Sequence, residues 1–117
     1  MGDVTIYHNP ACSTSRRTLA LLRERGVEPT VIEYLKTPPD KATLAGLLEA
    51  LKLAPSQFMR RKSKLVGELG LDQTGVPEFC YLAAMVSHPE LIERPVVVTP
   101  RGVRIGRPPE SVLEILE

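Results

Sequence analysis

Cys12 is the residue whose neighbours best suit chemistry. It lies in residues 7–19, YHNPACSTSRRTL, where an apolar stretch leads through a turn to a cysteine that opens a predicted helix. The N–H groups and the dipole at a helix start favour a thiolate, as do Arg16 and Arg17 nearby. A thiol that normally titrates near ~8.5 could be brought to roughly 7 or below at such a position. We therefore predict that Cys12 is a nucleophile; the alternative is a small buried apolar residue, as most cysteines are.

The spacing around Cys12 limits the chemistry. A dithiol oxidoreductase needs Cys-x-x-Cys, but the fourth position is Ser15. A cysteine phosphatase loop would need an arginine where this chain has Thr18. Ser15 could support the thiolate or only cap the helix. Cys80 is the other cysteine, and beside Phe79 in a predicted helix it is typical of a structural residue.

Three arginines stand where they could hold an anion. Arg60 lies near a predicted helix end, Arg94 precedes a Pro-initiated strand, and Arg107 follows a hairpin. Guanidinium groups can grip a tetrahedral oxyanion through paired hydrogen bonds, which lysine cannot reproduce. Each arginine taken singly is also typical of a solvated surface charge, so spacing alone does not group them.

The elements that position Cys12 form a β-α-β unit. Residues 4–7 and 30–35 are rich in β-branched residues and predict strands, while the leucine spacing in 14–25 predicts a helix that ends at Gly26. Strands joined through a helix are normally parallel, with a right-handed crossover.

The middle of the chain predicts helices and loops. Asp40 can cap a helix with leucines at 44, 47, 48 and 51, residues 57–62 suggest a short helix, and 63–77 a loop with one short helical piece. A helix from Pro77 to His88 is expected to bury Phe79, Leu82, Ala83 and Val86. We interpret residues 38–92 as a helical insertion.

The last quarter predicts a hairpin and a helix. Residues 96–99 and 103–106 read as two strands, and a helix beginning at Pro108 carries Val112, Leu113 and Leu116. The sequence thus predicts an α/β fold: a thioredoxin-like mixed sheet, β-α-β then β-β-α with a helical insertion, as a single domain over residues 1–117.

Composition restricts the partners and the compartment. The chain has 117 residues with a net charge of +1, 25% charged and 43% hydrophobic, so we expect no nucleic-acid or membrane partner. No apolar run or basic leader suggests a membrane span or signal peptide. Two cysteines 68 positions apart predict neither disulfides nor a metal site. We expect a cytoplasmic protein without a bound metal or cofactor.

Two stretches resemble the signatures of a known family. Residues 7–16 and 94–100 closely resemble those of the glutathione- and glutaredoxin-coupled arsenate reductases. The similarity also runs through residues 34–35, 38–39, 60, 88–89 and 106–108, so it covers nearly the whole chain.

The resemblance implies roles for the candidate residues. The cysteine matching Cys12 attacks arsenate to form a thiol-arsenate adduct, glutathione as co-substrate displaces at arsenic, and glutaredoxin completes the cycle. The arginines matching Arg60, Arg94 and Arg107 hold the oxyanion, with Arg61 as the alternative to Arg60. The histidine matching His8 tunes the cysteine; the alternative for His8 is a strand-end histidine whose hydrogen bonds are satisfied without any role at Cys12.

Two other functions stay open on the same scaffold. One is a glutathione-dependent reductase of another oxidised substrate. The other is a non-catalytic regulator, although regulators of this superfamily typically use the Cys-x-x-Cys that Ser15 interrupts.

Overall fold

The computed structural model describes residues 3–116, which fall into two compact units. Of the described residues, the sheet unit comprises 3–37 and 94–116, and the helical unit comprises Pro38–Glu93. The helical unit nearly coincides with the insertion expected at 38–92. That the two units act as a single domain stays a prediction.

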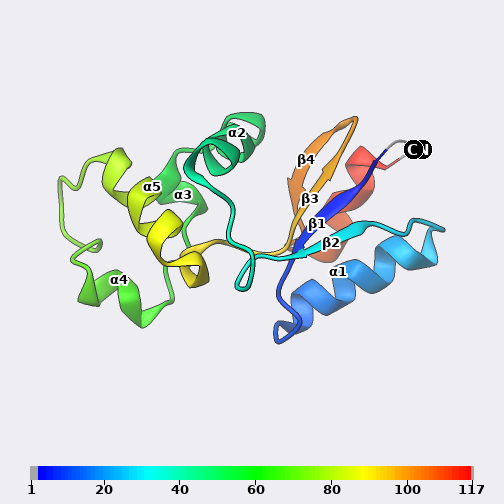
Figure 1. The fold of residues 1–117 in the computed structure, drawn as a ribbon, viewed down its shortest axis with the longest axis horizontal. Helices are drawn as coiled ribbons and strands as arrows, with labels where there is room; N and C mark the ends of the chain where they lie inside the picture. Colours follow the sequence, from blue (N-terminus) through cyan, green and yellow to red (C-terminus); the bar gives the residue numbers. More distant parts are fainter. Residues whose placement is uncertain (1–2, 117) are drawn as a thin grey trace. The chain divides into compact units, whose positions relative to one another are not determined.

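The sheet unit contains four short strands in a mixed sheet (Figure 1). The strands are β1 (Thr5–His8), β2 (Thr30–Glu33), β3 (Val96–Thr99) and β4 (Gly102–Ile105). Their order is β2-β1-β3-β4; β1 is parallel to β2 and antiparallel to β3, and β3 is antiparallel to β4. The predicted thioredoxin-like sheet and its parallel crossover are confirmed.

Helix α1 (Ser13–Glu24) and the 3-10 helix η2 (Pro109–Ile115) pack side by side and against the strands (Figure 1). Burial of α1 at Ser15, Thr18 and Leu22 turns one stripe of the helix toward the core. The buried apolar cluster of this unit consists of Val4, Ile6, Leu22, Val27, Val97, Val112, Ile115 and Leu116. This packing fixes α1, and thus the cysteine before it, on the sheet.

The last helix differs from the prediction. It is a 3-10 helix that buries Val112 and Ile115, with Leu116 just after it, whereas Leu113 is only partly buried. Side chains of the hairpin hold its last carbonyls: the Thr99 hydroxyl donates to the carbonyl of Ile115 over 2.7 Å. Two prolines at its start and these side-chain bonds favour the tighter turn.

The helical unit is organised by α2 (Lys41–Leu51), whose predicted cap is confirmed. The carboxylate of Asp40 accepts a hydrogen bond from the Thr43 N–H over 2.8 Å. The remaining helices are α3 (Pro55–Phe58), α4 (Lys64–Glu68), α5 (Glu78–Ser87) and the 3-10 helix η1 (Pro89–Leu91). The buried apolar residues of this unit are Leu44, Leu47, Leu48, Phe58, Met59, Val66, Leu71, Tyr81, Met85, Leu91 and Ile92.

The helix predicted over 57–62 is wrong in its position. Helix α3 ends at Phe58, because Met59 pairs with Ile92 in an isolated β-bridge and the Arg60 N–H donates to the Leu91 carbonyl over 2.8 Å. This long-range pairing pulls the backbone out of the helix before Arg60.

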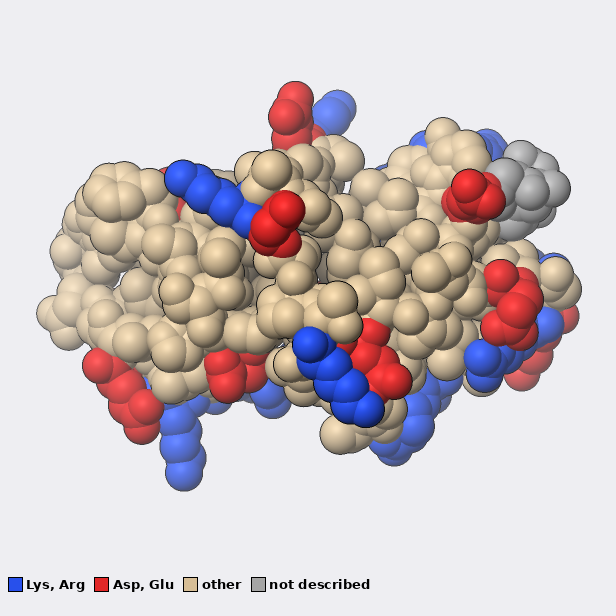
Figure 2. All heavy atoms as spheres, viewed as in Figure 1, with Lys and Arg blue, Asp and Glu red and all other residues tan. Residues whose placement is uncertain are grey.

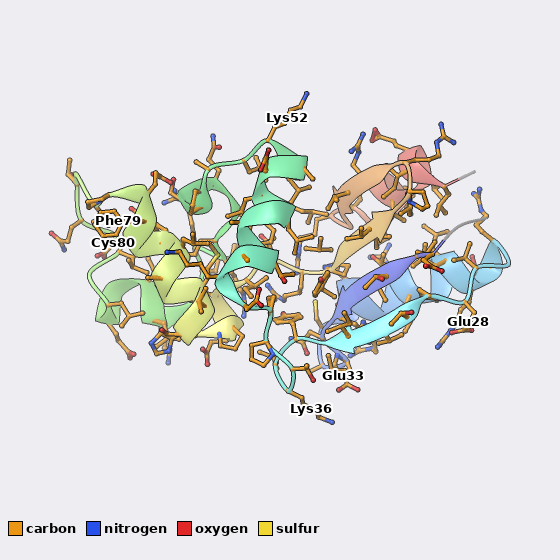
Figure 3. All side chains as sticks on the ribbon, turned by 45° about the horizontal axis from the view of Figure 1, so that its top comes forward. Glu28, Glu33, Lys36, Lys52, Phe79 and Cys80 are labelled. Carbon is orange, nitrogen blue, oxygen red and sulfur yellow. The ribbon has the colours of Figure 1, made fainter. Side chains whose placement is uncertain are left out.

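The predicted inner face of α5 is also wrong. Tyr81 and Met85 are buried, whereas Phe79 is 71% exposed and lies beside Cys80 at the start of the helix (Figure 3). The Tyr81 hydroxyl donates to the Leu71 carbonyl over 3.0 Å, which anchors this face. Because α5 is apolar on nearly every side, its periodicity could not identify the buried face.

The face of the molecule drawn in Figure 2 carries charges of both signs. Lys and Arg side chains are interspersed with Asp and Glu over the face seen in Figure 2. Within residues 3–116, no helix combines the length and apolar character that crossing a membrane requires.

Candidate functional site

The turn between β1 and α1 holds Cys12 at the helix start. The Asn9 side chain accepts a hydrogen bond from the Ala11 N–H over 3.0 Å, and the Cys12 N–H donates to the Asn9 carbonyl over 3.0 Å. The Arg16 guanidinium closes the turn with a bond of 2.8 Å to the Pro10 carbonyl. Cys12 is the N-cap residue of α1, so its side chain lies at the end of the helix that has unpaired N–H groups.

Opposing effects set the pKa of Cys12. Partial burial raises the pKa, but the backbone N–H of Ser15, the charge of Arg94, the backbone N–H of Thr14 and the charge of Arg107 together bring it below its ordinary value. A thiol with a lowered pKa is a thiolate in larger proportion near neutral pH, and the thiolate is the nucleophile.

Arg107 and Arg94 belong to the same unit as Cys12 and both act on its sulfur. The Nη2 atom of Arg107 is 3.5 Å from Cys12 Sγ, and its Nε donates to the Arg94 carbonyl over 2.7 Å. Arg94 as a residue is only 9% exposed. The residues that flank the β3–β4 hairpin, Arg94 before it and Arg107 after it, therefore bring two guanidinium charges toward one sulfur. The sequence could only suggest this arrangement.

His8 and Ser15 form a buried pair beneath the turn. The Ser15 hydroxyl lies 2.6 Å from His8 Nδ1 and accepts the Asn9 N–H over 3.1 Å. Burial lowers the pKa of His8, Glu33 raises it, and Arg23 and Arg16 lower it, with a net fall. A neutral ring can accept the hydroxyl hydrogen of the fully buried Ser15 at Nδ1.

Ser15 therefore relates to Cys12 in a way that its residue type did not suggest. Its hydroxyl is engaged by His8 and Asn9, whereas its backbone N–H lowers the pKa of Cys12. The groups facing the sulfur include main-chain donors, which any residue type would supply. Sequence reasoning could find them only from the position of Cys12 at the helix start.

Thr18 and Gly106 form a contact that sequence reasoning missed. Both residues are buried, and the Thr18 hydroxyl lies 3.4 Å from the Gly106 carbonyl oxygen. The available signal was a glycine directly before one of the candidate arginines. A glycine beside a functional residue often marks a close backbone approach.

The other candidate residues lie in the helical unit. The Arg61 guanidinium donates to the Ser56 carbonyl over 2.9 Å, while Arg60 follows Met59 with its N–H bonded to Leu91. Cys80 is half-buried, and His88 ends α5 with its Nδ1 3.7 Å from Glu90. That Arg60 joins the other two arginines stays a prediction.

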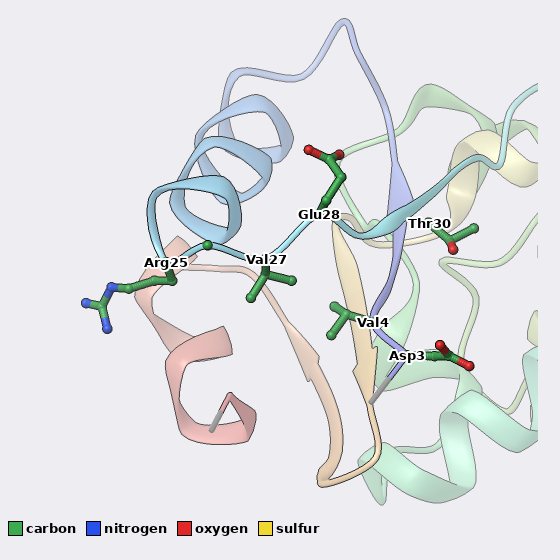
Figure 4. Close-up of a pocket in the computed structure, with 7 residues that line it drawn as sticks. Asp3, Val4, Arg25, Val27, Glu28 and Thr30 are labelled. Carbon is green, nitrogen blue, oxygen red and sulfur yellow. The ribbon is translucent and has the colours of Figure 1, made fainter. Parts of the chain in front are cut away.

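The surface of the sheet unit has several hollows, of which two bear on the position of Cys12. A groove of about 640 Å³ runs along α1 and is lined by His8, Pro10, Arg16, Leu19, Ala20, Arg23 and Glu24. A second hollow of about 450 Å³, between Asp3–Val4 and the chain after α1, lies at the end of the sheet away from Cys12 (Figure 4). Across residues 3–116, no group of three or more His, Cys, Asp or Glu side chains could hold a metal ion.

Comparison with known proteins identifies the family. The model of the ArsC family matches residues 7–115, which include both the cysteine turn and the Arg94–Arg107 segment. The chain belongs to the ArsC family. This match spans well over half of the chain and agrees with the resemblance carried by the two signature stretches.

Relatives within the ArsC family are similar over nearly the whole chain. An arsenate reductase of Rhizobium meliloti strain 1021 is 52% identical over 97% of this chain and 81% of its own length. Uncharacterized protein YfgD of Escherichia coli K12 is 53% identical over 97% of both chains. The solved structure of an arsenate reductase from Vibrio cholerae is 49% identical, with a TM-score of 0.94 over 98% of both chains.

Proposed function

We propose that this ArsC-family chain reduces arsenate to arsenite with Cys12 as the nucleophile. The observation that carries the proposal is the Arg107 Nη2 atom 3.5 Å from Cys12 Sγ, at a sulfur whose pKa is lowered. A thiolate beside a guanidinium suits an electrophile that is itself an oxyanion. The similarity to proteins named arsenate reductase selects arsenate among such substrates.

The reaction consumes two thiols. The Cys12 thiolate attacks arsenic, and an arsenate oxygen leaves as water after taking up protons, which gives a thiol-arsenate adduct. A glutathione thiol then supplies the second sulfur; arsenic gains two electrons and departs as arsenite, while the two sulfurs form a mixed disulfide on Cys12. Glutaredoxin, with another glutathione, returns Cys12 to the thiol.

The arginines would hold the oxyanion during attack. Arg94 and Arg107 provide two cations on the sulfur side, and Arg60 is the third member by resemblance. Arg60 rather than Arg61 is supported in this role, because the Arg61 guanidinium already donates a hydrogen bond to the Ser56 carbonyl within the helical unit. Planar guanidinium groups can pair with two oxygens of one anion.

His8 would act on Cys12 through the turn. Its ring contacts the Ser15 hydroxyl, and that hydroxyl accepts the Asn9 N–H, so the pair holds the main-chain donors in place.

We place the protein in the cytoplasm, because a reducing compartment supplies the thiols that the cycle consumes.

A coupled assay tests the proposal. Purified protein is supplied with arsenate, glutathione, glutaredoxin, glutathione reductase and NADPH, and NADPH oxidation is followed. We expect arsenate-dependent oxidation with the wild-type chain and none with Cys12→Ser. Folded wild-type protein that shows no arsenate-dependent oxidation would contradict the proposal.

A second candidate function is the glutathione-dependent reduction of another oxidised substrate. It stays open because a relative in E. coli K12 that is 53% identical is named only as an uncharacterized protein, so similarity at this level does not select arsenate alone. The same assay with a glutathione mixed disulfide in place of arsenate separates the two. Turnover of the disulfide without turnover of arsenate would favour this second function.

A further inference from the structure

We propose that Thr18 is a positioning residue for this site. Its side chain, packed against Gly106, fixes the first turns of α1 against the segment that carries Arg107. The contact thereby sets the distance between the Cys12 sulfur and the Arg107 guanidinium. The inference rests on the proposed roles of Cys12 and Arg107, but not on arsenate being the substrate.

Thr18 joins two parts of the chain that are far apart in sequence. The side chain is fully buried, its hydroxyl donates to the Thr14 carbonyl over 2.9 Å, and it lies 3.4 Å from the Gly106 carbonyl. A buried hydroxyl needs such acceptors, because an unsatisfied polar group in the interior is costly. The same hydroxyl therefore contacts the first turn of α1 and the chain after β4.

Gly106 leaves no space at this contact. A Cβ atom at Gly106 would lie 2.7 Å from Thr18 Oγ1 and 2.9 Å from Pro95 Cγ. Both distances are shorter than real carbon contacts, so the glycine backbone packs directly on Thr18 and Pro95. The Gly106 N–H also donates to the Pro95 carbonyl over 2.9 Å. This bond joins the residue after Arg94 to the residue before Arg107.

The groups that act on the sulfur stand next to this contact. Thr14, whose carbonyl Thr18 holds, contributes a backbone N–H that lowers the pKa of Cys12. Arg107 directly follows Gly106. A change in the contact must therefore move the helix start or the guanidinium, and a displacement of about 1 Å in an active site can cost roughly 100-fold in rate.

Alkylation of the sulfur measures this geometry without any arsenate. Cys12 is made the single thiol with Cys80→Ser, and its reaction with neutral iodoacetamide and anionic iodoacetate is followed against pH. A guanidinium near the sulfur favours the anionic reagent. The rate constant for iodoacetate divided by that for iodoacetamide therefore reports the position of Arg107.

Two variants change the contact. Thr18→Val removes the hydroxyl at constant size, and Gly106→Ala inserts the obstructing Cβ. For both variants we expect the midpoint of alkylation to rise toward ~8.5 and the ratio to fall about threefold.

Matched controls separate positioning from stability. Thr99→Val makes the same substitution in the same unit, where a buried hydroxyl donates to Ile115 over 2.7 Å. We expect it to lower the melting temperature about as Thr18→Val does, while midpoint and ratio stay at their wild-type values. Thr18→Ser retains the hydroxyl, so we expect it to keep the midpoint and the ratio close to their wild-type values. Gly46→Ala, with no heavy atom within 4 Å of the added Cβ, controls for the glycine replacement.

Two outcomes would overturn the inference. One is a folded Thr18→Val or Gly106→Ala protein with wild-type midpoint and ratio. The other is a Thr99→Val protein that changes both as much as Thr18→Val does. Wild-type protein that reduces no arsenate, but whose alkylation responds as expected, would leave the positioning role standing and reject the proposed function.

Discussion

The pKa of Cys12, the proposed nucleophile, depends on groups that a sequence reveals to different degrees. Arg94 and Arg107 lower this pKa through their charged side chains, which the sequence shows directly. Thr14 and Ser15 act through backbone N–H groups, which the sequence reveals only if the helix start is located correctly. Thr18 was invisible because its role comes from a neighbour 88 positions away.

Replacing Arg107 by lysine tests the guanidinium itself. A lysine keeps the charge but cannot donate to the Arg94 carbonyl and approach Cys12 Sγ from one planar group. We expect Arg107→Lys to lower kcat/KM for arsenate about 10- to 100-fold, which is ~1.4 to 2.7 kcal/mol. Arg104→Lys, whose Nε lies 3.7 Å from Glu114 on the protein surface, is the matched control. Equal activity of both variants would count against an oxyanion clamp.

The burial of His8 predicts a loss of stability in acid. Burial lowers the pKa of folded His8, the charge of Glu33 raises it, and the charges of Arg23 and Arg16 lower it. The net result is a pKa below the ordinary 6.5. Above pH ~6.5 the ring is neutral in both states, and below it the unfolded chain binds the proton more readily. Stability should therefore fall as the pH falls below ~6.5 and through the lower folded pKa.

The measurement for His8 is urea unfolding at pH 8 and pH 5.5. We expect the wild-type midpoint to drop between the two, and His8→Asn to show a smaller drop from a lower value at pH 8. A histidine whose replacement left the acid dependence unchanged would not be the group responsible.

At the scale of elements, prediction was accurate where periodicity and capping agreed. The Asp40 cap fixed the start of α2, and its leucines identified the buried face. The strands were recognised within one or two residues of their bounds, because β-branched residues and turn residues coincide there. Prediction failed at Phe58–Arg60, where pairing with Ile92 ends the helix, since no local signal encodes a partner more than 30 residues away.

The corrected face of α5 gives a test by truncation. Met85 is fully buried and Phe79 is 71% exposed, so the larger side chain should matter less. We expect Met85→Ala to cost about 2–5 kcal/mol of unfolding free energy and Phe79→Ala less than about 0.5 kcal/mol. Urea denaturation of both variants measures the difference. A reversed order would restore the face that the sequence suggested.

For the molecule as a whole, the sequence was sufficient for the fold class and the family. The order of elements and the two long motifs are properties of the chain itself, and the sheet order and the ArsC match agree with them. Whether Arg60 reaches the oxyanion depends on long-range geometry that spacing along the chain does not contain. The electron route is likewise a property of the complete reaction cycle.

The electron route predicts unequal roles for the two cysteines. A second thiol must complete the reduction, and an intramolecular one could only be Cys80, since no other cysteine exists. We propose glutathione instead, so Cys80→Ser should keep most of the activity in the glutathione and glutaredoxin assay while Cys12→Ser abolishes it. If folded Cys80→Ser were as inactive as Cys12→Ser, an intramolecular disulfide cycle would replace our scheme.

The bond from Arg107 Nε to the Arg94 carbonyl has a consequence for the entropy of substrate binding. An arginine on a protein surface normally samples many rotamers, so binding an anion to it costs side-chain conformational entropy. Here the bond to the Arg94 carbonyl already restricts the Arg107 side chain, so the oxyanion that we propose to bind there would lose less side-chain entropy on binding. Because the acceptor is a main-chain oxygen, truncating the Arg94 side chain would remove one charge and leave its neighbour preorganised.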